Sequence, residues 1–207
     1  MKKLIFFVIC ISSGFSLRAQ ESRSLIDKRD GRSYQIVTIG AQTWMAENLN
    51  FVMPDSWCYN YDETNCVKYG RLYIWESAMD ACPENWHLPS EPEWIILEKY
   101  LGMTDEETKI FYYRGDGIGT KLKLKENWNE VEGIVQGNNM TGFSALPGGF
   151  RIFYDSTFVE QGKRGSWWSS TKDGAYAFRR SLFSDKTGID RDLATPTNAF
   201  CVRCIKD

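Results

Sequence analysis

The segment 70–94 constrains the fold of this chain more than any other stretch. Apolar residues recur at helical spacing over about 74–82, which predicts a short helix whose apolar face ends in the thiol of Cys82. Pro83 follows directly and ends that helix. The sequence therefore predicts a short, well-bounded helix with a cysteine at its end.

A second helix is predicted over about 90–101. Ser90 and Glu93 form a Ser-x-x-Glu capping box just before an apolar run. A similar pattern predicts a third, weaker helix over 104–111. These short helices are the regular centre of a chain that is otherwise rich in strands and turns.

Strands are expected on both sides of the helices. Residues 34–39 and 42–45 predict a hairpin, whereas 52–69 is loop-rich and 112–150 is an irregular stretch dominated by Gly and Asn. Further short strands are expected at 150–154, 165–169, 175–183 and 199–205. Strands first, then helices, a long irregular middle and antiparallel strands indicate an α+β domain.

The N-terminus has the features of a secretory signal peptide. Two lysines precede a short apolar core, and a small residue, Ala19, offers a cleavage site. We expect a signal peptide over 1–19, a flexible lead over 20–26 and one domain over 27–207. No other apolar run is long enough to span a bilayer, so the mature chain is expected to be secreted, periplasmic or at the cell surface, with no membrane span.

The charge balance argues against two classes of partner. The whole chain has 25 Lys and Arg against 27 Asp and Glu. Cleavage removes three basic residues, so 25 − 3 = 22 remain against 27 acids, a net charge of −5. An acidic chain of this kind is not expected to bind nucleic acid or an anionic membrane surface.

Five cysteines remain after cleavage, and an exported protein can form disulfides. Cys58 and Cys66 flank a polar, turn-rich stretch that could close as a small ring. Cys82 needs a distant partner, for which Cys201 and Cys204 are candidates. A bridge between those two is disfavoured, because residues three apart on a strand point to opposite faces. An odd count leaves one thiol over.

Catalytic signatures are missing from the sequence. There is no Gly-x-Ser-x-Gly elbow, phosphate loop or paired-carboxylate pattern. The single histidine, His87, is expected to be packed and hydrogen-bonded, since one histidine beside disulfide cysteines makes a poor zinc site. Glu91, Glu93 and Trp94 could form a binding triad, but a capping Glu93 and a core Trp94 are favoured. We predict no catalytic residue, no cofactor and no metal ion.

Trp167 and Trp168 are candidate ligand-binding residues. Aromatic residues make up 14% of the chain, and neighbours on a strand point to opposite faces. One tryptophan is therefore expected to be buried and the other exposed, where its ring could stack on a sugar.

Asp185, Asp190 and Asp192 are also candidate ligand-binding residues. They lie in one expected loop, and their oxygens could serve calcium. Basic residues are interleaved with them, which favours a solvated acidic loop instead. Any ligand site is expected within 112–198.

Several sequence blocks are specific enough to indicate a family. They run from about residue 27 to residue 207 and comprise Asp30–Tyr34, Ile39–Asn50, Cys58–Tyr59, Asn65–Cys66, Tyr69–Tyr73, Cys82–Trp94, Gly142–Arg151, Trp167–Thr171 and Val202–Asp207. These blocks resemble the Fibrobacter succinogenes major paralogous domain, a family found in exported bacterial proteins. The resemblance implies membership without implying an activity.

A more distant similarity concerns the fold. The Leu-Pro-Ser-x-x-Glu-Trp pattern at 88–94 resembles a segment of formylglycine-generating (sulfatase-modifying) domains, and a helix-borne cysteine paired with a terminal strand is similar to C-type lectin-like domains. The resemblance implies a C-type lectin-like α+β fold with disulfides Cys58–Cys66 and Cys82–Cys204. The cysteines that formylglycine enzymes use have no matching pair here.

Export, the aromatic content and the missing catalytic cluster predict a non-catalytic binding module. Its expected partner is a carbohydrate or a surface protein. Two alternatives stay open: an enzyme distantly similar to formylglycine-generating domains or an unknown hydrolase, and a structural envelope protein without a small ligand.

Overall fold

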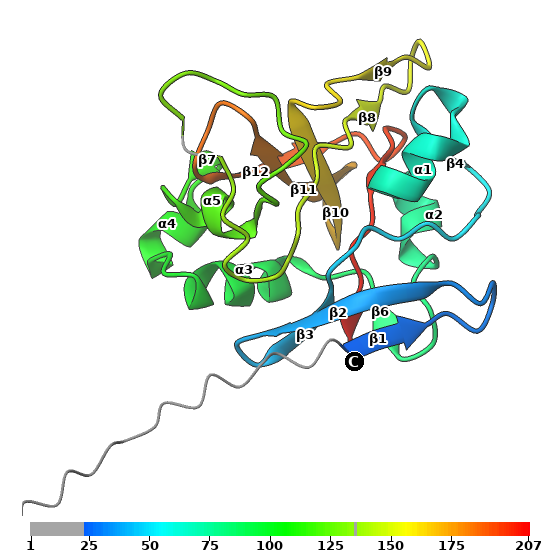
Figure 1. The fold of residues 1–207 in the computed structure, drawn as a ribbon, viewed down its shortest axis with the longest axis horizontal. Helices are drawn as coiled ribbons and strands as arrows, with labels where there is room; N and C mark the ends of the chain where they lie inside the picture. The colour runs from blue at the N-terminus through cyan, green and yellow to red at the C-terminus, as the bar shows by residue number, and fades with distance from the viewer. Residues whose placement is uncertain (1–22, 135) are drawn as a thin grey trace, which may run out of the picture.

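A computed structural model describes residues 23–134 and 136–207 of the chain (Figure 1). The fold is mixed α+β and is built mostly from sheets, with short helices around them. The expected signal peptide lies outside the described residues. Among the described helices, none is long and apolar enough to cross a membrane.

The first sheet has five strands and contains the expected hairpin. Its order is β1 (Arg23–Ile26), β2 (Ser33–Ile39), β3 (Gln42–Met45), β14 (Ile205–Lys206) and β6 (Trp86–His87). The β2–β3 turn passes through Gly40 at a φ of 61°, where glycine carries little steric cost. The expected flexible lead over 20–26 is wrong for its described part, because β1 pairs with β2 along its length.

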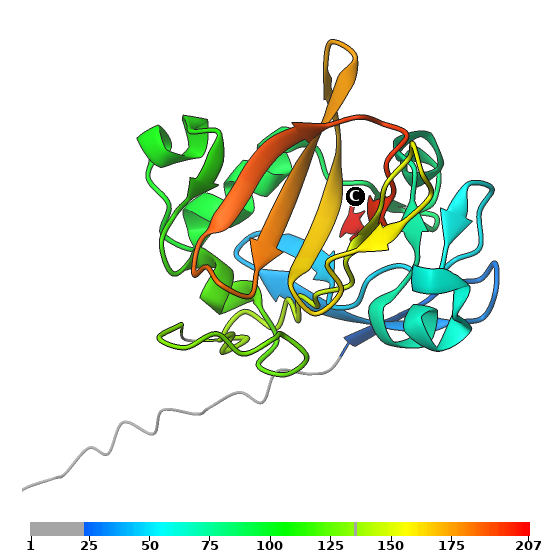
Figure 2. The same ribbon diagram turned by 90° about the horizontal axis from the view of Figure 1, so that it is seen from above.

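The second sheet has seven strands. Its order is β4 (Ser56–Trp57), β5 (Leu72–Tyr73), β13 (Phe200–Cys201), β10 (Arg164–Asp173), β11 (Tyr176–Phe183), β12 (Ile189–Ala194) and β7 (Tyr112–Arg114). Strands β10, β11 and β12 form an antiparallel meander at its centre (Figure 2). A small separate hairpin, β8 (Phe150–Arg151) with β9 (Phe158–Val159), lies beside it.

The helices follow the predicted caps, with shorter bounds. Helix α2 (Trp75–Met79) ends before Cys82, whereas α3 (Glu91–Tyr100) and α4 (Asp105–Lys109) begin at capping boxes. At the first box, the backbone N–H of Ser90 donates to Glu93 at 2.7 Å. The caps fix where α3 and α4 begin.

Regular elements also form where loops were expected. The expected loop over 52–69 contains the 3-10 helix η1 (Tyr59–Tyr61) and the helix α1 (Glu63–Tyr69), which Asp62 caps at Thr64. The irregular stretch contains α5 (Ile118–Leu122), and the expected acidic loop is the strand β12. The local sequence periodicity of these elements is too weak to predict them, and they are stabilised by contacts with segments that are distant in the sequence.

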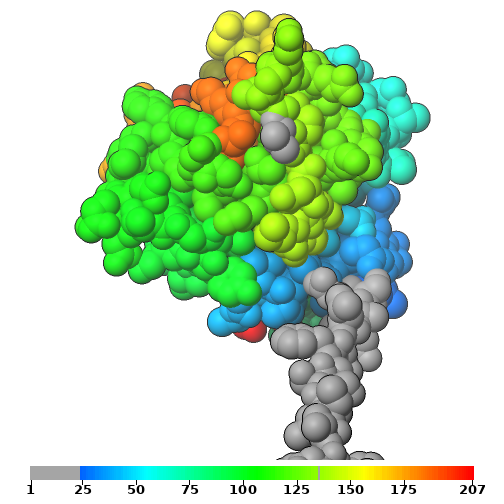
Figure 3. Space-filling model, turned by 60° about the vertical axis from the view of Figure 1, so that its left-hand side comes forward, coloured from blue at the N-terminus to red at the C-terminus, as the bar shows by residue number. Residues whose placement is uncertain are grey.

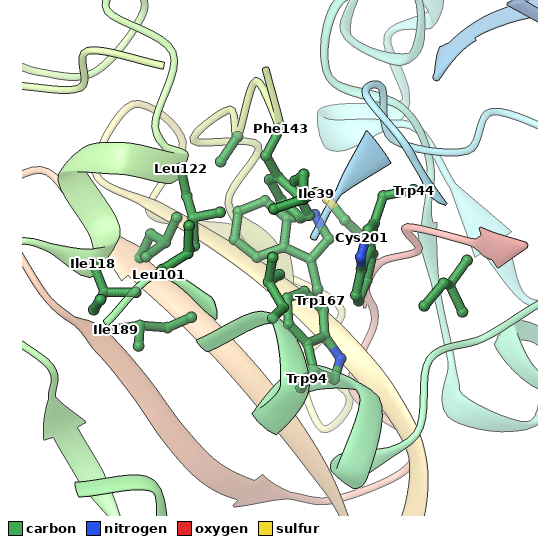
Figure 4. Packing of buried hydrophobic residues seen from close by; sticks show 14 of the residues in the cluster. Ile39, Trp44, Trp94, Leu101, Ile118, Leu122, Phe143, Trp167, Ile189 and Cys201 are labelled. Atoms are coloured by element: carbon green, nitrogen blue, oxygen red, sulfur yellow. The ribbon is translucent and has the colours of Figure 1, made fainter. Parts of the chain in front are cut away.

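Large aromatic rings fill the core near the junction of the sheets (Figure 4). Trp44 of β3 and Trp94 of α3 have ring centroids 5.0 Å apart, and Phe143 contacts both rings and also Trp167. The N-terminal sheet, α3 and the central strand β10 therefore share one core.

Two disulfides hold the fold together with the pairings that the resemblance implied. Cys58 is joined to Cys66 and Cys82 to Cys204. The second bridge ties the end of α2 to the residue before β14, a sequence separation of 122. Cys201 is free and buried, and burial raises the pKa of its thiol to about 12.

Candidate functional site

Both tryptophans of β10 lie in the core. Trp167 and Trp168 are almost inaccessible to solvent, so the expectation that one of them is exposed is wrong. Each indole N–H is satisfied at 2.8 Å, by Asn48 Oδ1 for Trp167 and by the carbonyl of Tyr73 for Trp168. Strand β10 is central in its sheet and is covered on both faces, which strand alternation alone does not reveal.

The outer face of the β10–β12 meander carries a polar network instead. Here Arg179 of β11 contacts two carboxylates of β12: Nη1 lies 3.4 Å from Asp190 and Nη2 2.5 Å from Asp192. Its Nη1 also donates to Ser181 Oγ at 2.5 Å. Burial, and then the charge of Arg164, lower the pKa of Arg179 to about 10. The guanidinium is still charged at neutral pH and is firmly held.

Arg164 of β10 approaches the same hydroxyl from the neighbouring strand. Its Nη2 donates to Ser181 Oγ at 3.1 Å and its Nε to Ser166 Oγ at 2.9 Å. Its Nη1 lies 3.3 Å from Glu160. Two arginines thus converge on one serine, and each has a carboxylate on its other side.

This network forms part of a pocket of about 310 Å³. We call it the Arg164–Arg179 pocket; its lining residues are Phe150, Arg164, Tyr176, Arg179, Leu193, Ala194, Thr195, Asn198 and Phe200. In Figure 2 the β10–β12 meander is in front, and the helix α3, which packs on its inner face, lies behind it. Tyr176, at the tip of the β10–β11 hairpin, is 51% exposed. The pocket combines an exposed ring with fixed donors and acceptors.

The three candidate aspartates do not form a common cation site. Asp190 and Asp192 are engaged with Arg179, whereas Asp185 is exposed in the turn after β11. Among the described residues, the group of ligand atoms close enough for a metal is Cys58, Glu63 and Cys66, and its cysteines are joined in a disulfide. The calcium alternative therefore has no support in this geometry.

The inner face of the meander carries a second network. Arg180, the neighbour of Arg179, makes two bonds of 2.7 and 2.9 Å to Glu91 and one of 2.6 Å to Glu98. Arg114 adds a bond of 2.6 Å to Glu98, and Arg191 pairs with Glu91. We call this the α3 network, because α3 supplies both glutamates. Arg114, Arg180, Glu91 and Glu98 are buried, and Arg191 is only slightly exposed.

His87 is hydrogen-bonded, as expected. Its Nε2 lies 2.8 Å from Glu93 and its Nδ1 2.5 Å from Asp207. Burial alone would lower the pKa of His87, but the bonds to Asp207 and Glu93 outweigh it and raise that pKa. Ser90 bonds to Glu93 and not to the imidazole, so no nucleophile is activated here.

A second pocket of about 240 Å³ lies between the β2–β3 hairpin, α1 and the loops that follow α5. Charged side chains at its rim include Glu47 and Lys68, and Tyr34 lies buried against it. It falls largely outside the stretch 112–198. The green and yellow-green part of the chain, which contains the first part of that stretch, covers most of one face (Figure 3).

The residues of the Arg164–Arg179 pocket were not anticipated from the sequence. A usable signal was present, because Arg164 with Ser166 and Arg179 with Ser181 share an Arg-x-Ser spacing that places each pair on one face of a strand. Recognising it requires knowing that the two strands pair with Ser166 opposite Ser181.

Comparison with known proteins gives one result. The family model described as the Fibrobacter succinogenes major domain matches residues 37–206. No curated protein matches the chain. No solved structure matches it either.

Proposed function

Because this chain belongs to the Fibrobacter succinogenes major domain family, we propose that it is an exported, non-catalytic binding module whose ligand is a carbohydrate. The two disulfides suit an oxidising compartment outside the cytoplasm. The proposed architecture is C-type lectin-like, supported by the helix-end Cys82 bridged to Cys204 beside a terminal strand.

The Arg164–Arg179 pocket is the observation that carries this proposal. Carbohydrates present hydroxyl groups, which both donate and accept, and C–H faces, which pack on aromatic rings. The pocket offers arginine donors, the polar side chains of Thr195 and Asn198, and the exposed ring of Tyr176. The carboxylates of Asp190 and Asp192 hold Arg179 in place but do not line the pocket. The arginines are paired with carboxylates in place, which suits the uncharged, hydroxyl-rich part of a ligand.

Binding is favoured over catalysis by the state of the nucleophile candidates. Among the described cysteines only Cys201 is outside a disulfide, and it is buried with its pKa raised to about 12. A reactive cysteine requires an accessible thiolate. Chemistry of the formylglycine-generating type therefore gains no support here.

Glycan-array screening of the mature protein, followed by calorimetry on the sugars retained, tests the proposal. Replacing the exposed ring, Tyr176→Ala, is expected to weaken binding at least tenfold without changing the melting temperature. Tyr112→Ala removes another exposed ring, from the far edge of the sheet, and is the matched control. A folded protein that retains no glycan, or equal binding by both variants, would reject the proposal.

A further inference from the structure

Arg151, on strand β8, has no polar partner for its guanidinium. Among residues 23–134 and 136–207 no hydrogen bond or ion pair to this side chain is found, and its Nε is buried without a partner. The charge of Arg151 acts on the exposed carboxylate of Asp155, whose pKa it helps to lower after the hydrogen bonds from Thr157, but the two side chains are not paired. Other arginines of the same sheet region, such as Arg164 and Arg179, are held by serines and carboxylates. A part-buried arginine left unpaired carries a desolvation cost that a bound anion would relieve.

Aromatic rings surround this guanidinium. Its central carbon lies 4.1 Å from the ring centre of Trp57 on β4 and 6.0 Å from that of Phe158 on β9. Phe158 in turn contacts the rings of Tyr59 and Tyr61, with centroids 5.3 and 5.0 Å away. The rings hold the planar guanidinium in place while its nitrogens keep their bonding capacity.

Strained backbone holds one of these rings in the solvent. Asn60 and Tyr61 adopt φ values of 54° and 59°, the left-handed region that a bulky residue rarely enters. Tyr61 is nevertheless 64% exposed, with only the edge contact to Phe158 among its rings. Strained residues cluster at ligand-binding positions, and what distinguishes Tyr61 from the similarly strained and exposed Tyr112 is its ring contact with Phe158 beside Arg151.

We propose that Arg151, with Trp57, Phe158 and Tyr61, forms a second subsite that binds the carboxylate of an acidic sugar. The guanidinium would bind the carboxylate through two parallel hydrogen bonds, and the exposed Tyr61 ring would pack on the sugar face. The inference rests on the proposed function and narrows its ligand to uronic-acid glycans. Phe150 lines the Arg164–Arg179 pocket, so the β8–β9 hairpin lies between the two subsites.

Calorimetry with oligogalacturonate and with its methyl ester distinguishes the contribution of the carboxylate charge to binding from that of the rest of the sugar. The two ligands share a backbone and differ only in whether the carboxylate is free. The wild type is expected to bind the free acid at least tenfold more tightly, since a charge-assisted bond contributes about 1.5–3 kcal/mol and 1.4 kcal/mol is tenfold. Arg151→Gln should remove this preference, and Arg151→Lys should restore only part of it.

Arg32→Gln is the matched control, because it removes the same charge from an exposed position beside the β2 strand. It should keep the preference, and melting curves should show all variants folded. Equal binding of acid and ester by the wild type, or an unchanged preference in Arg151→Gln, overturns the subsite. If the ester still binds and Tyr176→Ala still weakens its binding at least tenfold, only this inference fails and the proposed function stands.

Discussion

Both faces of the β10–β12 meander carry arginine–carboxylate pairs, but one set is covered by α3 and the other lies beside an open pocket. Arg179 and Arg180 are neighbours on β11, and each bonds to two carboxylates. The carboxylates of Arg180 come from α3, which covers them, whereas those of Arg179 come from the adjacent strand, and Arg179 itself lines an open pocket. The α3 network is part of the protein interior, whereas the network of Arg179 lies at the surface pocket.

This difference separates a structural role from a binding role more clearly than residue type does. In the α3 network the members are buried, except for the slightly exposed Arg191, so each charge depends on the others for its solvation. Beside the Arg164–Arg179 pocket, Glu160 and Asp192 are partly exposed, so water can replace part of a lost partner. Removing equivalent arginines should therefore have unequal effects on stability, and only the loss of Arg179 should weaken ligand binding.

The largest effect is expected for Arg180→Gln. The substitution removes three hydrogen bonds and leaves Glu91 and Glu98 short of positive charge inside the protein. Breaking a buried pair in this way costs about 3–5 kcal/mol of unfolding free energy. Urea unfolding followed by tryptophan fluorescence measures the loss, and a loss below 1 kcal/mol would show that the inner network is not structural.

A smaller effect on the same network is expected from acid. Burial alone would raise the pKa of Glu91, but Arg180 and then Arg191 outweigh burial and lower it. The stabilisation from Glu91 is therefore present above its unfolded pKa and is lost as the pH falls through the lower, folded pKa. Urea midpoints measured between pH 7 and pH 3 should fall more steeply for the wild type than for Glu91→Gln. Parallel profiles would contradict the assignment.

Compared with Arg180→Gln, the substitution Arg179→Gln should lower the unfolding free energy less and weaken glycan binding more. Arg179 and Asp190 are themselves buried, but Asp192 is partly exposed and water can solvate it, so we expect a loss of about 1–3 kcal/mol, smaller than that of Arg180→Gln. Glycan affinity should fall at least tenfold, because the variant loses the donors that order the pocket. A stability loss as large as that of Arg180→Gln would break the comparison between the two faces.

The smallest effect concerns His87, which lies outside both networks and is 41% exposed at its side chain. Its raised pKa means that its stabilisation is present below the unfolded pKa and is lost as the pH rises through the folded pKa. Solvent screening keeps the contribution below about 1 kcal/mol. Thermal melts between pH 5.5 and 8.5 should show this decline in the wild type, and a flatter profile in His87→Gln.

Local signals allowed part of the fold to be predicted. The capping residues Ser90 and Glu93 mark the start of α3, and the β2–β3 hairpin follows its turn at Gly40. Elements that depend on distant partners were missed. The charged residues of β12 led to the prediction of a loop, and it is the pairing with β11 and β7 that makes this segment a strand.

The binding site was harder to anticipate for the same reason. Trp168 is buried because Phe200 of β13 packs on it, at a centroid distance of 4.5 Å, and β13 lies far away in the sequence. Arg179 and Arg180 are neighbouring residues of the same type, so the sequence does not distinguish them. Which of them meets a helix and which a pocket is decided by the two faces of a sheet assembled from distant strands.

The position of the final strands has a consequence for the order of folding. Strand β13 lies between β5 and β10 in one sheet, and β14 lies between β3 and β6 in the other. A chain that emerges N-terminus first must therefore wait for residues 200–206 before either sheet is continuous. Until then the edges of β3, β5, β6 and β10 stay unpaired, and unpaired edges invite association. Folding should be slow and late, and a chaperone that shields those edges would matter more here than in a fold closed by its first strands.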